Sequence, residues 1–282
     1  HLPAAALFIL LAACSPSPDP VRESEKLNAL INRLSPSRAD ATGPAVDSMS
    51  VTSFGRELAE TRALLADLNA IDTSVLKGDD RIDWKFAKSI LSGREIEQSG
   101  IMPWKRDPRL YMTFTGLSTV MESPASLKEK AEKIGNTLRL AVIQMSNGRK
   151  QLETHVPRFR DLGLFMAENS RVLLGEELPA FIANNNLPEL EPQVREAATE
   201  LERYIAFLKD ELPGKPEGNF AIGDSLYNAL LRGQYLLGYD ADSLYAFGRA
   251  QFDATVKELE QLAATMKPGT DRKSTRLNSS HT

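Results

Sequence analysis

Histidine and cysteine are the residue types that most often carry metal or nucleophilic chemistry, and this chain has few of them. Its 282 residues include three histidines, His1, His155 and His281, and one cysteine, Cys14. A histidine-dependent zinc site takes two or three histidine ligands, and only His155 lies in the central part of the chain. No nucleophile-elbow pattern surrounds His155. We therefore assign no metal ligand and no catalytic residue, and we expect His155 to cap a helix or to lie at the surface.

Four aromatic and basic side chains could line a substrate cleft: Trp104, Arg106, Arg109 and Tyr111. The guanidinium group of either arginine can bind a carboxylate, such as that of a peptide, through two parallel hydrogen bonds. For Trp104 and Tyr111, packing is the main interpretation, because aromatic side chains at the start of a helix are commonly buried, and a place in the cleft is the alternative. Asp107 between the two arginines suits a helix N-cap, whose carboxylate accepts backbone N–H bonds. These four residues are the candidate cleft residues.

The amino-terminal segment is typical of an exported bacterial lipoprotein. Residues 1–13 are mostly apolar and too short to span about 30 Å of bilayer as a helix, which suits the remnant of a signal peptide. The sequence LAAC at 11–14 resembles a lipobox, and residues 14–20 form a Pro/Ser linker. Cys14 is therefore predicted to carry a lipid, with a buried core cysteine as the alternative. Ser15 favours the outer membrane, facing the periplasm.

The two ends are expected to depart from a native protein. No initiating Met or basic region precedes the leader. Residues 271–282 are polar and aperiodic, follow Pro268-Gly269, and resemble translated adapter sequence. A native disordered tail is the alternative. The helical domain is then expected over residues 21–270.

The charge balance argues against a nucleic-acid partner. The chain has 34 Lys and Arg residues against 38 Asp and Glu residues, a net charge of −4. Binding to a phosphate backbone depends on concentrated positive charge, which this composition does not supply.

Apolar residues recur at helical spacing along most of the chain. Helices are predicted over 21–34, 54–68, 79–96, 108–120, 126–145, 155–174, 192–212, 224–237 and 242–266. The apolar spacing places these residues on the inner faces of their helices: Leu27 and Leu30 in the first, Ile82 and Phe86 in the third, Tyr111 and Phe114 in the fourth, and Ile134, Leu138 and Met145 in the fifth. Ser126 and Glu129 have the spacing of a capping box. The predicted fold class is all-α with long antiparallel helices, in which the first helices pack as a separate hairpin and strands are limited to a short pair.

Five segments resemble the bacterial domain of unknown function 885 family. They are DDRIDW at 79–84, MPWKRDPRLY at 102–111, GNF at 218–220, YNALL at 227–231 and DSLYAFG at 242–248. The resemblance implies the amino-terminal part of a larger, secreted or lipid-anchored helical protein similar to zinc metallopeptidases. In that family a His-Glu-x-x-x-Gly-His helix supplies the zinc ligands and the general base. This sequence has no such motif, so no metal or catalytic residue transfers to it; zinc and a peptide or small-molecule substrate are implied for the full-length protein.

Two hypotheses from different classes follow. In the first, the chain is part of a lipid-anchored envelope enzyme and forms one wall of a substrate cleft that the rest of the protein completes. In the second, it is a non-catalytic helical lipoprotein that acts as a binding or scaffold module. The first predicts an exposed apolar face on the isolated chain, whereas the second predicts none.

Overall fold

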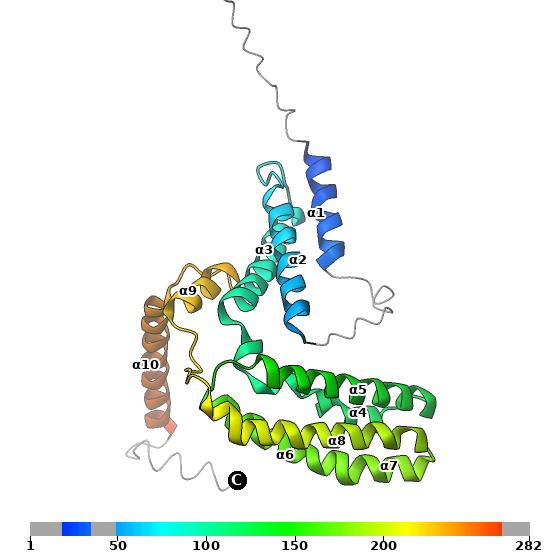
Figure 1. The fold of residues 1–282 in the computed structure, drawn as a ribbon. Helices are drawn as coiled ribbons and strands as arrows, with labels where there is room; N and C mark the ends of the chain where they lie inside the picture. Colours follow the sequence, from blue (N-terminus) through cyan, green and yellow to red (C-terminus); the bar gives the residue numbers. More distant parts are fainter. Residues whose placement is uncertain (1–18, 35–48, 267–282) are drawn as a thin grey trace, which may run out of the picture.

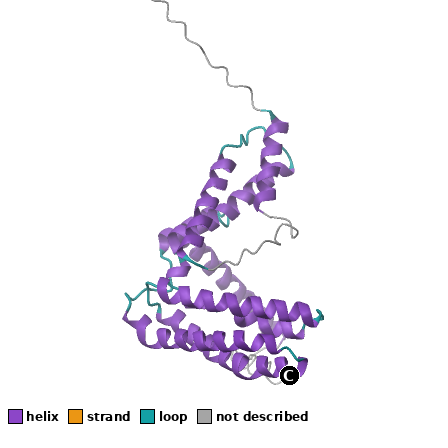
Figure 2. Ribbon diagram, turned by 45° about the vertical axis from the view of Figure 1, so that its right-hand side comes forward, coloured by secondary structure: helices purple, strands orange, loops and turns teal. Residues whose placement is uncertain are grey.

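The computed structural model describes residues 19–34 and 49–266, and these residues are almost entirely helical (Figures 1 and 2). No strand occurs within the described ranges; one isolated bridge pairs His155 with Glu217. The all-α prediction is therefore confirmed. The predicted leader, the lipidation residue Cys14 and the tail at 271–282 lie outside the described residues.

Ten α-helices are connected by short 3-10 and π-helical turns in the described part of the chain. Their bounds are α1 Pro20–Leu34, α2 Val51–Asn69, α3 Asp79–Ile96, α4 Leu117–Glu122, α5 Leu127–Gln151, α6 Pro157–Val172, α7 Leu178–Asn185, α8 Glu191–Ala206, α9 Asp224–Gly233 and α10 Ala241–Met266. None of these helices combines the length and the apolar character needed to cross a bilayer.

Helices α1, α2 and α3 pack around a core of their own, so the first helices do pack separately but form a three-helix lobe in place of the expected hairpin. Leu27, Leu30, Leu64, Leu68 and Leu91 are among its buried residues. They recur every three or four residues along each helix, so each helix turns one apolar stripe towards the other two. In Figure 1 this lobe stands above the rest of the molecule.

The prediction that Ile82 and Phe86 face the core was wrong. Their side chains are 65% and 64% exposed. They lie on the same face of α3 as Ser89 and Gly93, which are closer to its carboxyl terminus. Ser89 donates a hydrogen bond to the carbonyl of Gln234, just after α9, and Gly93 packs against the Gln234 side chain. Because α9 covers only the carboxyl-terminal half of this face, the amino-terminal half is left in solvent.

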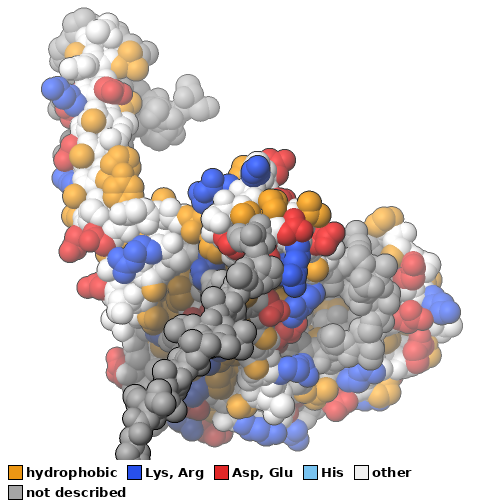
Figure 3. Space-filling view, turned by 90° about the horizontal axis from the view of Figure 1, so that it is seen from above, with side chains coloured by type: hydrophobic (Ala, Val, Ile, Leu, Met, Phe, Trp, Pro, Cys, Tyr) orange, Lys and Arg blue, Asp and Glu red, His pale blue; other side chains and the backbone are white. Residues whose placement is uncertain are grey.

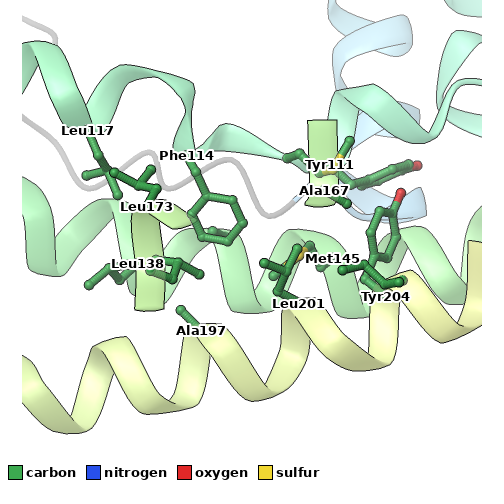
Figure 4. Close-up of a cluster of buried hydrophobic side chains, with 14 of the residues drawn as sticks. Tyr111, Phe114, Leu117, Leu138, Met145, Ala167, Leu173, Ala197, Leu201 and Tyr204 are labelled. Atoms are coloured by element: carbon green, nitrogen blue, oxygen red, sulfur yellow. The ribbon is translucent and has the colours of Figure 1, made fainter. Parts of the chain in front are cut away.

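Helices α5 to α8 form a second, larger lobe around a separate core (Figure 4). Helix α5 begins at the predicted capping box, since the Ser126 side chain accepts from Glu129 N–H and the Glu129 side chain accepts from Ser126 N–H. Ile134, Leu138 and Met145 on its inner face are fully buried. The local pattern that predicted this helix therefore also predicted its buried face.

Not all neighbouring helices in this lobe are antiparallel. Helix α6 does run antiparallel to α8. Arg171 pairs with Glu202, and Glu168, which precedes Arg171, pairs with Lys209, which follows Glu202. Helices α5 and α8 run in the same direction: Gly135 near the start of α5 contacts Gln193 near the start of α8. The chain returns through α6 and α7, and this return brings two parallel helices together (Figure 1).

Two predicted boundaries were wrong. The continuous helix expected over 108–120 is instead two 3-10 turns, Pro108–Tyr111 and Thr113–Gly116, followed by the short α4. The helix predicted to end at residue 174 instead continues through the π-helical turn Leu173–Glu177 directly into α7. Tyr111, Phe114 and Leu117 are nevertheless fully buried, because three-residue spacing keeps them on one side of 3-10 turns as well.

Two contacts at and just before the start of α2 connect the two lobes. Gln151 at the end of α5 donates a hydrogen bond to the carbonyl of Met49, at 2.7 Å. The ring of Phe54 on α2 stacks on Trp104, with ring centroids 5.2 Å apart. This connection sets the orientation of the segment 103–111 that holds all four candidate cleft residues.

Candidate functional site

Three chain segments that are distant in sequence meet at one end of the second lobe. The backbone N–H of Glu153 donates to the carbonyl of Lys105 at 2.8 Å. The N–H of His155 donates to Pro216, and Gly218 donates back to His155, at 2.9 and 2.8 Å. The turn at 103–106, the start of α6 and the segment 216–220 are therefore joined through their backbones.

Gly218 allows the closest approach in this junction. A Cβ atom at this position would lie 2.4 Å from Thr154 Cγ2 and 3.4 Å from Val156 Cγ2. Real Cβ contacts are essentially never below 3.0 Å. Any larger residue at this position would therefore force the Thr154 side chain or segment 216–220 to move.

A cavity of about 540 Å³ opens beside this junction, at the amino terminus of α6. Its lining residues are Val156, Pro157, Arg158, Glu217, Gly218, Asn219 and Phe220. The Arg158 guanidinium lies over the Phe220 ring, 5.5 Å from its centroid. Neither Arg158 nor Glu217 forms an ion pair with another described residue. The cavity thus has an unpaired cation, an unpaired carboxylate and an exposed aromatic ring on its walls.

Arg106 lies next to this cavity. Its guanidinium donates a hydrogen bond to the carbonyl of Asn219, a lining residue, and lies 6.0 Å from the centroid of the Phe159 ring. Arg106 Nε and His155 Nε2 are buried and have no hydrogen-bond partner in the structure. A buried donor or acceptor without a partner costs free energy, so both nitrogen atoms remain available for a hydrogen bond to a ligand or a water molecule.

Arg109, in contrast, is held by Asp107. Its Nε and terminal nitrogen lie 2.8 and 2.5 Å from the two carboxylate oxygens, and the guanidinium lies 4.8 Å from the centroid of the Phe159 ring. The hydrogen bond to Asp107 raises the pKa of Arg109 above its ordinary value. Asp107 also accepts from the Arg109 N–H as an N-cap, as predicted, although the element it caps is a 3-10 turn. Arg109 is therefore occupied by an internal partner.

Trp104 and Tyr111 pack within the protein. Tyr111 is fully buried, and its hydroxyl donates to the carbonyl of Trp104 and accepts from Gln151. Burial raises the pKa of Tyr111 well above that of a free tyrosine. Trp104 stacks on Phe54. Both aromatic residues connect segment 103–111 to the neighbouring helices, and neither lines the cavity.

The structure therefore places Arg106 next to the cavity, whereas the other three candidates contact other parts of the protein and do not line the cavity. Arg158 and Glu217, which line the cavity, were not singled out from the sequence. They are 59 positions apart and no local motif connects them. The one available signal was the sequence GNF at 218–220, which marks the segment opposite α6.

The described residues do not fit a bound zinc ion. Within residues 19–34 and 49–266, no group of three or more His, Cys, Asp or Glu side chains is placed to hold a metal. We therefore derive no chemical step through a metal from this part of the chain.

Comparison with known proteins identifies the family. The family model described as "Bacterial protein of unknown function (DUF885)" matches residues 36–279. A solved structure from Shewanella oneidensis, described as "a putative lipoprotein of unknown function", aligns with a TM-score of 0.69 and 18% sequence identity. The alignment covers 90% of this chain and 49% of that chain, so this chain spans about half the length of its solved relative. No curated protein matches the sequence. Because the family model covers most of the chain and the resemblance carried by 79–84 and 102–111 points the same way, this chain belongs to the bacterial DUF885 family.

Proposed function

We propose that this chain is the substrate-recognition part of a lipid-anchored envelope hydrolase, and that the cavity at the start of α6 binds a free amino acid or a short peptide. The observation that carries the proposal is the pair of opposite, unpaired charges on the walls of one cavity, Arg158 and Glu217. A ligand with both an ammonium and a carboxylate group, such as a free amino acid or a short peptide, has charges of the matching signs.

The other features of the cavity fit the same class of ligand. Its volume of about 540 Å³ lies within the range of roughly 300–1,000 Å³ that is usual for small-molecule sites. Phe220 offers an apolar contact for a side chain. No side chain caps the amino terminus of α6, where the helix dipole favours a carboxylate. Arg106, next to the cavity, adds a second guanidinium.

The class of enzyme follows from the resemblance to zinc metallopeptidases. In this proposal the zinc ion and its general base belong to the remainder of the full-length protein, and this chain contributes binding and orientation of the substrate. Zinc would supply an activated water for hydrolysis of the peptide bond. The alternative, a lipoprotein that binds peptides without hydrolysing them, uses the same cavity and differs in the absence of turnover.

The anchor is part of the same proposal. The sequence LAAC at 11–14 supports lipidation of Cys14, with the protein held at the outer membrane and facing the periplasm. Metabolic labelling with a radioactive fatty acid is expected to mark the wild-type protein but not the Cys14→Ser variant. Label on the Cys14→Ser variant would contradict this assignment.

Ligand binding by the cavity can be measured on the chain itself. We expect isothermal titration calorimetry to detect binding of dialanine, and at least tenfold weaker binding of its amide and of its N-acetyl derivative. Arg158→Gln should remove the discrimination against the amide, and Glu217→Gln the discrimination against the acetylated peptide. Arg81→Gln on α3 is the matched control and should bind as the wild type does. Equal binding of all three ligands, or equal loss in Arg81→Gln, would overturn the proposal.

The hydrolase assignment needs the full-length gene product. We expect it to contain one equivalent of zinc, to cleave short peptides, and to lose cleavage on chelation while dialanine binding by the present chain persists. Peptide binding without cleavage at full zinc occupancy would instead support the non-catalytic binding module.

A further inference from the structure

Helix α10 has no covered face. It has 26 residues and is about 39 Å long, yet none of residues 241–265 is buried. Its main contacts with the rest of the described structure lie in its first two turns, where Asn228 of α9 accepts a hydrogen bond from the N–H of Ala241 and the Tyr239 ring lies 5.7 Å from the Phe247 ring. Beyond these two turns the helix stands apart from the helices of the second lobe (Figure 1).

An apolar stripe runs along this helix. Tyr245, Phe252 and Leu259 are seven residues apart and are 74%, 56% and 59% exposed. At 100° per residue, seven residues bring a side chain back to within about 20° of its starting direction, so the three lie in one row. Val256 and Ala263 lie beside this row. We call these five residues the α10 stripe.

The charged residues of this part of α10 lie beside the stripe, and one of them, Arg249, lies over the Phe252 ring, 5.5 Å from its centroid. Arg249, Asp253, Lys257 and Glu260 follow one flank of the helix, and Arg249 pairs with Asp253 at 3.3 Å. In Figure 3, hydrophobic side chains (orange) are visible along the arm at the upper left. This is the side of the molecule on which Figure 1 places α9 and α10. A helix with one apolar row and a charged flank is built to pack against another helix, since most of the stability of such helices comes from tertiary packing.

We propose that the α10 stripe is the docking surface for the other half of the full-length protein, through a helix that follows residue 266 in the same polypeptide. The solved relative contains about as much chain again as this chain matches. Helix α10 is the last described element, so the chain that follows it starts at the end of the stripe. A partner helix with its own seven-residue apolar row would fit the spacing of Tyr245, Phe252 and Leu259. The inference rests on the proposed function in one respect, that the chain is part of a longer protein.

The test uses two polypeptides: the present chain and the polypeptide that the source gene encodes after Thr270. We expect analytical ultracentrifugation to show a 1:1 complex, and hydrogen exchange in α10 to slow at least tenfold in that complex. The double variant Phe252→Gln/Leu259→Gln should weaken the complex at least tenfold. Ala250→Gln/Ala254→Gln places the same two amides on the opposite face and should leave the complex unchanged.

Three results would overturn this inference. The first is a source gene that ends close to this point. The second is absence of the complex, or equal binding by both double variants. The third is a dimer of the present chain that Phe252→Gln/Leu259→Gln dissociates, which would make a second copy the occupant of the α10 stripe. The measurement needs neither zinc nor peptide, and Arg158→Gln should form the complex normally, so its outcome is independent of the function proposed for the cavity.

Discussion

The hydroxyl of Tyr111 accepts a hydrogen bond from the Gln151 side chain at 3.0 Å, and the same Gln151 nitrogen lies 2.7 Å from the carbonyl of Met49. Gln151 therefore connects the buried tyrosine of segment 103–111 with the start of α2. Both side chains are buried, so water cannot replace these hydrogen bonds. Through this connection, the segment that carries Arg106 is held in place by both lobes.

Replacing Tyr111 by Phe should destabilise the protein by about 1–3 kcal/mol, because the carbonyl of Trp104 and the amide of Gln151 each lose a buried partner. Urea unfolding followed by circular dichroism measures the loss. Tyr227→Phe is the control. Tyr227 is 40% exposed, and loss of its hydroxyl group should change the free energy of unfolding by less than about 0.5 kcal/mol. Equal effects of the two variants would show that the Tyr111 hydrogen bonds do not stabilise the fold.

Gly218→Ala should displace segment 216–220, since the added methyl group would lie 2.4 Å from Thr154 Cγ2. We expect a loss of about 1–3 kcal/mol and, if the cavity binds dialanine, weaker binding as well. Gly55→Ala in α2 has no atom within 4 Å of the new methyl group and should stabilise the protein by about 0.5–1 kcal/mol. Unchanged stability and binding in Gly218→Ala would contradict the close approach described at this junction.

Arg149 and Glu200 join α5 to α8 through hydrogen bonds of 3.0 and 2.7 Å to one carboxylate oxygen. Because Glu200 is buried, Arg149→Leu should cost about 2 kcal/mol, within the range for hydrogen bonds to charged groups. A double-mutant cycle with Glu200→Leu isolates the pairwise energy. The same cycle on the exposed pair Arg171 and Glu202 should give less than about 1 kcal/mol. A larger coupling for the exposed pair would contradict this ranking.

Glu23 should make the first lobe sensitive to acid. Its buried carboxylate accepts hydrogen bonds from Lys26 and from the N–H of Asp72, and these lower its pKa below the ordinary value of 4.5. A carboxyl group with a lowered pKa in the folded state stabilises the fold above pH 4.5, and this contribution is lost as the pH falls through the folded-state pKa. Unfolding of the wild type and of Glu23→Gln, measured from pH 7 to pH 3, should show a difference that shrinks below pH 4.5. A difference independent of pH would contradict this assignment; the exposed Glu25→Gln serves as the control.

Local sequence pattern predicted the helical class, the capping box at Ser126 and the buried faces of α1 and α5, because these depend on neighbours within one or two helical turns. It also predicted the burial of Tyr111 and Phe114, although the segment around them forms 3-10 turns in place of the α-helix expected over 108–120. Burial follows residue type and spacing, whereas the exact helical hydrogen bonding depends on what packs around the segment.

The tertiary structure decided which apolar faces are covered and which residues line the cavity. Ile82 and Phe86 have the spacing of core residues, yet α9 stops short of them, and no pattern within α3 could show how far another helix extends. The cavity depends on Arg158 and Glu217, brought together by a backbone junction that Gly218 permits. Local spacing encodes which face of a helix is apolar; contacts between segments distant in the chain determine what covers that face and which charges meet, because they depend on the packing of the whole chain.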